Sequence, residues 1–121
     1  MPLPDEPKNP IKIRELKVSE SNVLSACLSH LSYLGIFHWR NNTGAVPGEY
    51  KGKKRFVRYG RKGMPDIVAC INGRMVGIEV KSPIGKQSEA QKKFEDELTA
   101  AKGTYCLVRS LDQLEAFLKT L

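Results

Sequence analysis

The sequence predicts a single α/β (α+β) domain, in which helices flank a mixed β-sheet and the elements follow the order α-β-β-β-α-β-α. Three observations support this fold class. The chain has 121 residues, a length that suits one domain. Hydrophobic residues make up 40% of it, which is enough for one compact core and too much for a disordered chain. Apolar residues recur with helical spacing in three segments, and shorter apolar runs of strand length lie between them.

The N-terminal part is expected to contain an extended arm followed by a helix. Four prolines within residues 1–17 interrupt helical and ladder hydrogen bonding, so we expect an irregular arm there and a folded domain over residues 18–121. Ser19 is a good N-cap for a helix whose apolar face continues to about Leu34. Gly35 then ends this helix.

Between this helix and the central apolar strands the sequence favours less regular structure. Residues 36–40 predict a short strand. Residues 41–50 contain two Asn, two Gly and one Pro, and they predict a loop. The basic residues 51–60 are compatible with a hairpin arm formed with the strand before them.

The C-terminal half carries the stronger signals. Strands are expected over residues 66–71 and 74–81, joined by Asn72-Gly73, because this dipeptide suits a two-residue type I′ turn with positive φ at both positions.

Two helices and one strand complete the domain. Ser88 caps a helix that continues to about residue 102, with Ala90, Phe94, Leu98 and Ala101 facing inward. A buried strand over residues 104–109 and a closing helix over residues 111–121 follow it.

Charge predicts the kind of partner. The formal net charge is +7, which favours a polyanion. Much of it lies in one run without any acidic residue: Lys51, Lys53, Lys54, Arg55, Arg58, Arg61 and Lys62. The run is either a solvated loop or an arm that follows the phosphates of a nucleic acid while Tyr50, Phe56 and Tyr59 pack or stack.

Composition also argues against several classes of protein. No apolar run approaches the ~18 residues of a transmembrane helix, and the first ten residues lack a secretory pattern, so we expect a cytoplasmic protein. Cys27, Cys70 and Cys106 lie far apart in apolar stretches, which predicts buried free thiols. Neither histidine lies near a cysteine pair, so we expect no zinc site.

The candidate chemistry lies in the predicted hairpin. Pairing around the Asn72-Gly73 turn places Asp66 opposite Glu79, with about 5 Å between opposed positions. Facing carboxylates destabilise a sheet unless they are compensated, and a divalent cation with oxygen ligands is one compensation. Lys81 shares a strand face with Glu79 and can reach a water or phosphate there. The alternative is that Asp66 starts a strand and Lys81 is a solvated strand end.

Several motifs resemble the PD-(D/E)xK nuclease superfamily, and specifically its virus-type replication-repair nuclease domain (VRR-Nuc), in a stand-alone phage or bacterial form. They are Gly-Met-Pro-Asp-Ile at 63–67, Gly-Ile-Glu-Val-Lys at 77–81, Ser88-x-x-Gln91 and Trp-Arg-Asn-Asn-Thr-Gly at 39–44. The similarity covers roughly residues 19–110, nearly the whole chain.

The resemblance implies a restriction-endonuclease-like core, a requirement for Mg²⁺ or Mn²⁺ and endonuclease action on DNA, including branched DNA. It also implies that Glu20 and Gln91 complete the site, and it favours a homodimer. Glu20 has an alternative role as an acid stabilised by the helix N-terminus. Gln91 equally suits a capping box with Ser88.

The expected function is hydrolysis of DNA phosphodiester bonds by a metal-dependent endonuclease, structure-selective or nonspecific. Asp66, Glu79 and the Val80 carbonyl would hold the ion, and Lys81 would orient a water. Arg40 and Asn42 would add phosphate contacts to those of the basic run. Two rivals remain: a catalytically inert nucleic-acid-binding module that uses residues 51–62, and a structural subunit with a positive surface.

Overall fold

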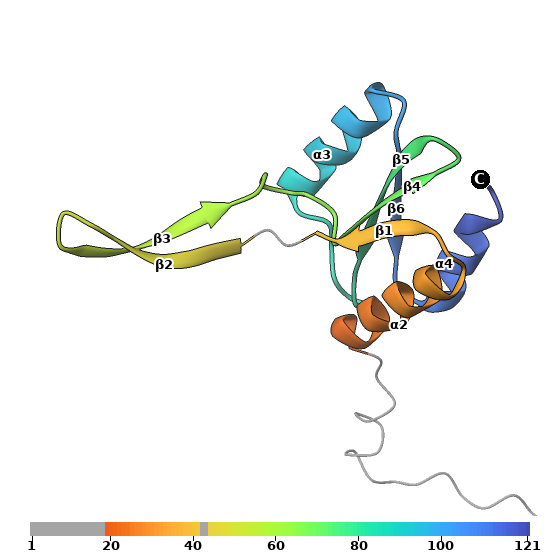
Figure 1. The fold of residues 1–121 in the computed structure, drawn as a ribbon, viewed down its shortest axis with the longest axis horizontal. Helices are drawn as coiled ribbons and strands as arrows, with labels where there is room; N and C mark the ends of the chain where they lie inside the picture. Colours follow the sequence, from red (N-terminus) through yellow and green to blue (C-terminus); the bar gives the residue numbers. More distant parts are fainter. Residues whose placement is uncertain (1–18, 42–43) are drawn as a thin grey trace, which may run out of the picture.

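The structure is a computed structural model that describes residues 19–41 and 44–121. The arm predicted for residues 1–17 and the candidate phosphate contact Asn42 lie outside these ranges. Figure 1 shows a core of helices and strands from which one long hairpin projects.

The core contains a four-stranded sheet in the order β1-β4-β5-β6. Its strands are β1 (Phe37–Arg40), β4 (Ile67–Ile71), β5 (Arg74–Val80) and β6 (Thr104–Val108). The first two pairings are antiparallel and the pairing of β5 with β6 is parallel, so the sheet is mixed as predicted.

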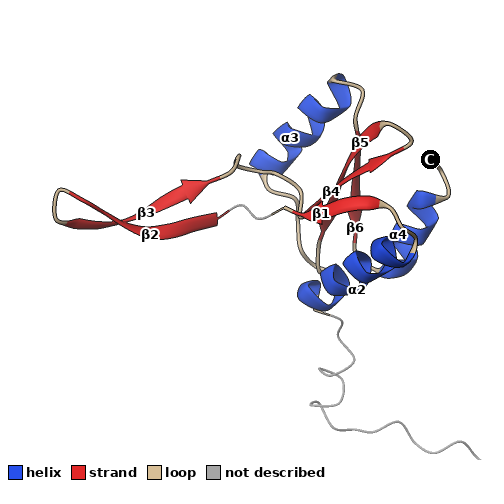
Figure 2. Ribbon diagram, viewed as in Figure 1, coloured by secondary structure: helices blue, strands red, loops and turns tan. Residues whose placement is uncertain are grey.

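Three helices flank this sheet: α2 (Glu20–Tyr33), α3 (Glu89–Ala100) and α4 (Leu111–Leu118). Figure 2 shows α2 and α4 together, apart from α3. Together with the sheet strands they give the predicted order α-β-β-β-α-β-α, which confirms the fold class. Among the described helices the longest is α2, whose 14 residues are too few and too polar to cross a bilayer.

Strand alternation decides which helix each sheet face contacts. Val76, Ile78 and Val80 on β5 are fully buried in one hydrophobic core with residues of α2 and α4. Gly77, between them in sequence, lies instead against Leu98 of α3. The residues that alternate with the core of β5 therefore face α3, and Glu79 is among them; Lys81 directly follows the strand.

Local signals in the sequence fix the ends of the helices. Ser19, Ser88 and Ser110 each cap a helix by accepting a backbone hydrogen bond. Gly35, with φ +69°, follows α2 as predicted. One inward position was wrong, because Ala101 lies at the C-cap of α3 and is exposed.

The loop predicted for residues 41–50 is wrong. Most of it forms β2 (Gly44–Tyr50), which pairs antiparallel with β3 (Lys53–Tyr59) in a separate two-stranded sheet. Lys51 and Gly52 have φ of 51° and 74°, as in a two-residue type I′ turn. The basic run therefore does form a hairpin arm, but its partner is β2 and not the strand at residues 36–40. Pro47 is tolerated because a two-stranded sheet consists only of edge strands.

The expectation of three buried thiols holds only in part. All three cysteines are free, and Cys27 is buried and Cys106 half-buried, but Cys70 is exposed. Ile67 and Ala69 occupy the core side of β4, so the alternation directs Cys70 to the opposite face.

Gly63 provides a test of how the segment before Asp66 is positioned. It has φ +82°, and a Cβ there would lie 2.3 Å from the Ala90 carbonyl oxygen at the start of α3. Gly35 has a similar φ of +69°, but a Cβ added to it would meet nothing within 4 Å, so it is a matched control. Gly35→Ala should cost about 1 kcal/mol through its left-handed backbone alone.

Gly63→Ala should cost at least about 1 kcal/mol more than this control, because the clash with helix backbone adds to the same conformational penalty. Urea denaturation of both variants measures the difference. Equal free energies of unfolding would show that the segment moves away from α3 without penalty.

Candidate active site

The β4–β5 hairpin brings the two predicted carboxylates opposite each other. Asn72 and Gly73 at its turn have φ of 53° and 76°, as the type I′ turn requires. The register pairs Ile67 with Ile78, so the next step toward the open end places Asp66 opposite Glu79. The predicted hairpin and its register are confirmed.

On the other side of β4, the residue after strand β1 pairs with Asp66. The Asn41 amide donates to the Asp66 carbonyl oxygen at 2.7 Å, which continues the β1–β4 ladder beyond Arg40. Its side-chain Nδ2 also donates to the Pro65 carbonyl oxygen at 3.4 Å. Asp66 is therefore held by backbone pairing on the side of β1.

Glu79 is the one polar or charged residue with a buried side chain in the part of the chain that the structure describes, at 2% exposure. Its Oε1 accepts a hydrogen bond from Gln91 Nε2 at 3.0 Å and lies 3.7 Å from Lys81 Nζ. Its Oε2 is buried and has no hydrogen-bond partner among these residues. Such an acceptor is costly unless something supplies a proton or a positive charge.

The Asp66 side chain contacts the backbone of the opposite strand. Its Oδ2 accepts from the Val80 amide at 2.8 Å. In an extended strand the N–H and C=O of one residue leave the backbone on the same side. The Val80 carbonyl is therefore directed toward the Asp66 side of β5, whereas the Lys81 amide donates in the other direction, to Val108 O at 3.0 Å.

Electrostatics reflects this crowding. The pKa of Glu79 is raised from 4.5 to about 8, chiefly by burial and next by the charge of the neighbouring Asp66. Lys81 opposes the shift, and Glu20 adds to it. At neutral pH, without a cation, Glu79 therefore favours its protonated form.

These observations bear on the predicted metal ion. No three His, Cys, Asp or Glu side chains cluster as a metal site within residues 19–41 and 44–121. Two carboxylates do meet, however: one has an unpartnered buried oxygen, and the Val80 carbonyl is directed to the Asp66 side of β5. Hard oxygen donors of this kind suit Mg²⁺ or Mn²⁺, which keep several waters. The residues present fit such an ion.

Gln91 combines the two roles that the sequence left open. Its Oε1 accepts from the Ser88 backbone amide at 2.8 Å and the Gln91 backbone amide donates to Ser88 Oγ at 3.2 Å, which completes the capping box. Its Nε2 is left to donate to Glu79. The start of α3 is thus fastened to the buried carboxylate.

Lys81 and Glu20 occupy different surroundings. The Lys81 side chain is only 14% exposed, so its ammonium group is held close to Glu79. Glu20 lies in the exposed first turn of α2, as the helix-dipole alternative required. Its charge nevertheless reaches Glu79, because it contributes to the raised pKa of that residue.

The candidate phosphate contacts are spread more widely. Lys53 and Lys62 are exposed, and so is Arg40 at the end of β1. Arg61 already forms an ion pair with Glu97 and lies 5.2 Å above the Phe94 ring, so its charge is partly compensated.

Sequence analysis missed Arg109, which supports the site, and the buried hydroxyl of Tyr105. Arg109 Nη1 donates to the carbonyl oxygens of Ser82 at 2.5 Å and Gly85 at 2.7 Å, so it fixes the segment between Lys81 and α3. Tyr105 has a buried hydroxyl without a hydrogen-bond partner in the described part of the chain, and its pKa is raised to about 12, chiefly by burial. The contacts of Arg109 leave no local signal, because their carbonyl acceptors are remote in sequence.

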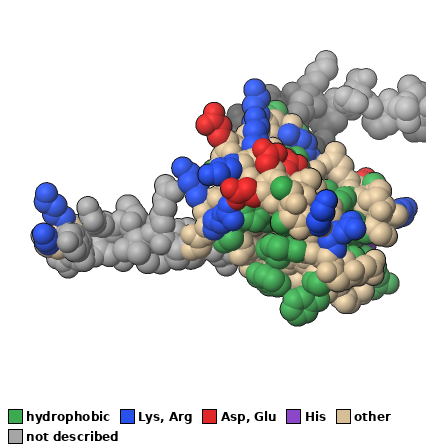
Figure 3. Space-filling view, turned by 90° about the horizontal axis from the view of Figure 1, so that it is seen from above, with side chains coloured by type: hydrophobic (Ala, Val, Ile, Leu, Met, Phe, Trp, Pro, Cys, Tyr) green, Lys and Arg blue, Asp and Glu red, His purple; other side chains and the backbone are tan. Residues whose placement is uncertain are grey.

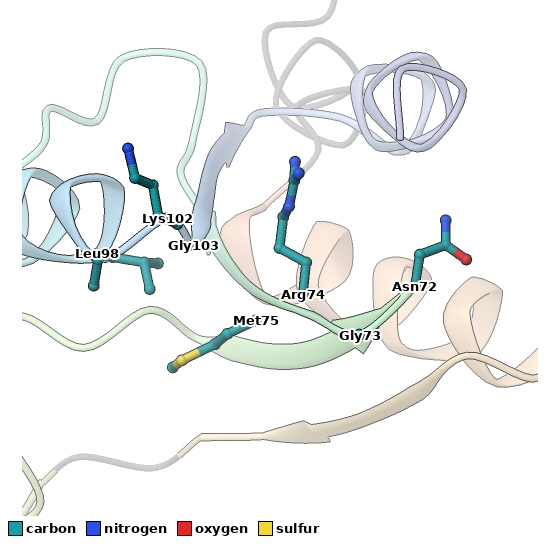
Figure 4. A pocket seen from close by; sticks show the side chains of 8 residues that line it. Asn72, Gly73, Arg74, Met75, Leu98, Lys102 and Gly103 are labelled. Atoms are coloured by element: carbon teal, nitrogen blue, oxygen red, sulfur yellow. The ribbon is translucent and has the colours of Figure 1, made fainter.

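One cavity of the described structure lies away from this site. Figure 4 shows a pocket of about 410 Å³ lined by the β4–β5 turn and the end of α3, with Arg74, Met75 and Lys102 around it. It lies at the opposite end of β5 from Glu79. The carboxylate pair therefore does not line this pocket.

No family model, curated protein or solved structure matches this chain. The resemblance to virus-type replication-repair nucleases therefore stays a prediction that rests on its motifs.

The raised pKa of Glu79 predicts the pH dependence of stability. Its pKa is about 4.5 when unfolded and about 8 when folded, so the folded state binds the extra proton between these values. The free energy of unfolding of the metal-free protein should therefore fall as the pH rises from 5 to 8. Glu79→Gln preserves the shape of the side chain and an oxygen that can accept from Gln91, but it cannot titrate. The variant should therefore lose this part of the pH dependence, which amounts to roughly a few kcal/mol at most in the free energy of unfolding.

Thermal denaturation in a chelator at several pH values measures this difference. Parallel pH profiles for the wild type and Glu79→Gln would contradict the buried, proton-binding state of Glu79.

Proposed function

We propose that this protein is a metal-dependent endonuclease that hydrolyses DNA phosphodiester bonds. One observation carries the proposal: Asp66 faces the buried Glu79 at the open end of a hairpin, and one Glu79 oxygen has no partner among the described residues. A structural role alone gives no reason to bury a carboxylate beside a second one. A divalent cation would compensate both.

Asp66, Glu79 and the Val80 carbonyl would hold this cation. When bound, it would polarise a phosphoryl oxygen and lower the pKa of a water. The Val80 amide fixes the Asp66 carboxylate, and Gln91 fixes that of Glu79, so both would be oriented before an ion arrives. Glu20 would add negative charge at the edge of the site.

Lys81 has a separate task in this proposal. Its ammonium group lies 3.7 Å from Glu79 Oε1 and is largely shielded from solvent. Placed there, it would donate to the attacking water and to a phosphate oxygen as negative charge develops. The basic hairpin and Arg40 would position the backbone without reading sequence, which favours structure-selective or nonspecific cleavage.

Labelled duplex, flap, four-way and single-stranded DNA, each with Mg²⁺, Mn²⁺ or a chelator, test the activity directly. Cleavage that the chelator abolishes supports the proposal. Binding of all four substrates without products in either metal would instead support an inert binding module. We include a homodimer in the proposal, because two sites would act on the paired strands of a branched substrate.

Substitutions at the pair should separate its roles. Asp66→Ala and Glu79→Ala should each reduce Mn²⁺-supported cleavage at least ~100-fold, because each removes a proposed ligand, while DNA affinity in chelator stays close to the wild type. Lys81→Ala should lose most of the rate while retaining the rise in melting temperature that Mn²⁺ gives the wild type. Near-wild-type cleavage in either carboxylate variant would remove that residue from the site.

The basic hairpin should act through charge. Replacing Lys53, Lys54 and Arg55 together with Ala should weaken binding to every DNA sequence alike, and the salt dependence should flatten by about 0.9 log units for each phosphate that the protein no longer neutralises. Anisotropy titrations at several salt concentrations give this slope. An unchanged slope would show that the hairpin is solvated and does not contact DNA phosphates, and weaker binding limited to particular sequences would mean that it contacts bases.

A further inference from the structure

An exposed aromatic pair lies on the same sheet face as the carboxylate site. Phe37 and Trp39 on β1 are 70% and 48% exposed. Their ring centroids are 5.8 Å apart in an edge-to-face arrangement, with an interplanar angle of 75°. This arrangement leaves at least one face of each ring outside the contact between them.

Strand alternation sets the face of this pair. His38, between the two aromatic residues, contacts Ser32 of α2 through Nε2 at 3.4 Å. Phe37 and Trp39 therefore project on the opposite face, which is the face of Glu79 and α3. On this face Trp39 shares a row with Val68 and Gly77, and Phe37 shares the next row with Cys70 and Met75.

The rows place Trp39 close to the site. Asn41 pairs with Asp66, so Trp39 lies one strand and two residues away from Asp66. With the usual strand spacing and rise this is roughly 8 Å between Cα positions. Phe37 lies about 7 Å farther along β1. No described helix covers these rings, and Figure 3 shows hydrophobic side chains gathered on the surface of the core.

We propose that Phe37 and Trp39 form an aromatic platform that stacks unpaired bases of the DNA strand whose phosphate lies at the carboxylate pair. The proposal rests on the proposed function and names its substrate class: DNA with a single-stranded segment beside the scissile bond. The 5.8 Å between the ring centroids exceeds the ~3.4 Å rise of stacked bases, so bases that reach both rings must be separated from each other.

Charge favours a nucleic acid over an apolar protein partner. Arg61 and Lys62, in the segment that leads to Asp66, and Lys93 of α3 line a hollow of about 240 Å³ beside Phe94, although Arg61 is already paired with Glu97. The full chain has 20 Lys and Arg against 13 Asp and Glu. An aromatic surface with cations beside it is the usual design of single-strand binding sites.

The chain supplies its own probe for this contact. Trp39 is its single tryptophan, so its fluorescence reports on the platform alone. Titration with oligothymidylate in a chelator, where no cleavage occurs, should quench this fluorescence. An oligomer of the same length with abasic sites offers the same phosphates without bases, and it should bind with little quenching.

Variants extend the test to affinity, measured by anisotropy of labelled oligomers. Phe37→Ala and Trp39→Ala should each weaken oligothymidylate binding about tenfold and leave the abasic oligomer unaffected. Tyr33→Ala is the matched control, because Tyr33 is an aromatic residue with 86% exposure on α2, and it should change neither. Circular dichroism verifies the fold of each variant.

Equal affinity of the variants for oligothymidylate, or equal quenching by the abasic oligomer, would overturn the platform. A dimer formed through this face would also overturn the platform, because a second copy would then cover the rings. Its signs would be Trp39 fluorescence that changes with protein concentration alone and a dimer in light scattering that Trp39→Ala abolishes. Failure of cleavage with intact quenching would overturn the endonuclease and retain the platform. Cleavage without base-dependent quenching would do the opposite.

Discussion

The register of one hairpin determines what every other part of the candidate site can contribute. Glu79 reaches the α3 face opposite Asp66 because the Asn72-Gly73 turn pairs Ile67 with Ile78. A shift by one residue would exchange the two faces of the strand and bring Glu79 into the apolar core beside α2 and α4. The packing of Val76, Ile78 and Val80 in that core therefore protects the chemistry on the other face, since burial of these three side chains excludes the alternative register.

The buried Glu79 carboxylate is energetically unfavourable in this fold. One Glu79 oxygen is satisfied by Gln91 and approached by Lys81, and the other has no partner among the described residues. The neighbouring Asp66 raises the pKa of Glu79 further, so the pair repels when both groups are ionised. Violations of this kind are expected at functional sites, where local cost is offset by packing elsewhere. The same features that destabilise the metal-free protein would make it receptive to a cation.

Much of this arrangement could be predicted from the sequence because its signals are local. The turn dipeptide, the Ser88–Gln91 capping box and the alternation of the apolar strands each act within a few residues. Strand β2 was missed because Pro47 and the glycines around it are typical of loops, and Lys51 is an unusual residue for a turn with positive φ. Arg109 was missed for a different reason: its carbonyl acceptors are 24 and 27 residues away. The second contact of Gln91, with Glu79, likewise depends on how α3 docks on the sheet.

The position of α3 explains why one face of the sheet can hold both proposed surfaces. This helix contacts β6, and its Leu98 lies against Gly77, so it covers the β5–β6 side and leaves the aromatic pair on β1 exposed. Gly63, packed against Ala90, joins the segment before Asp66 to the same helix. The carboxylate pair thus lies at the boundary between covered and open sheet. On the covered side, burial strengthens electrostatic interactions and raises the pKa of Glu79. On the open side, β1 presents ring faces that a flexible strand could reach, whereas the stacked bases of an intact duplex offer no face to them. In the proposed endonuclease, this boundary would therefore favour substrates in which paired and unpaired DNA meet.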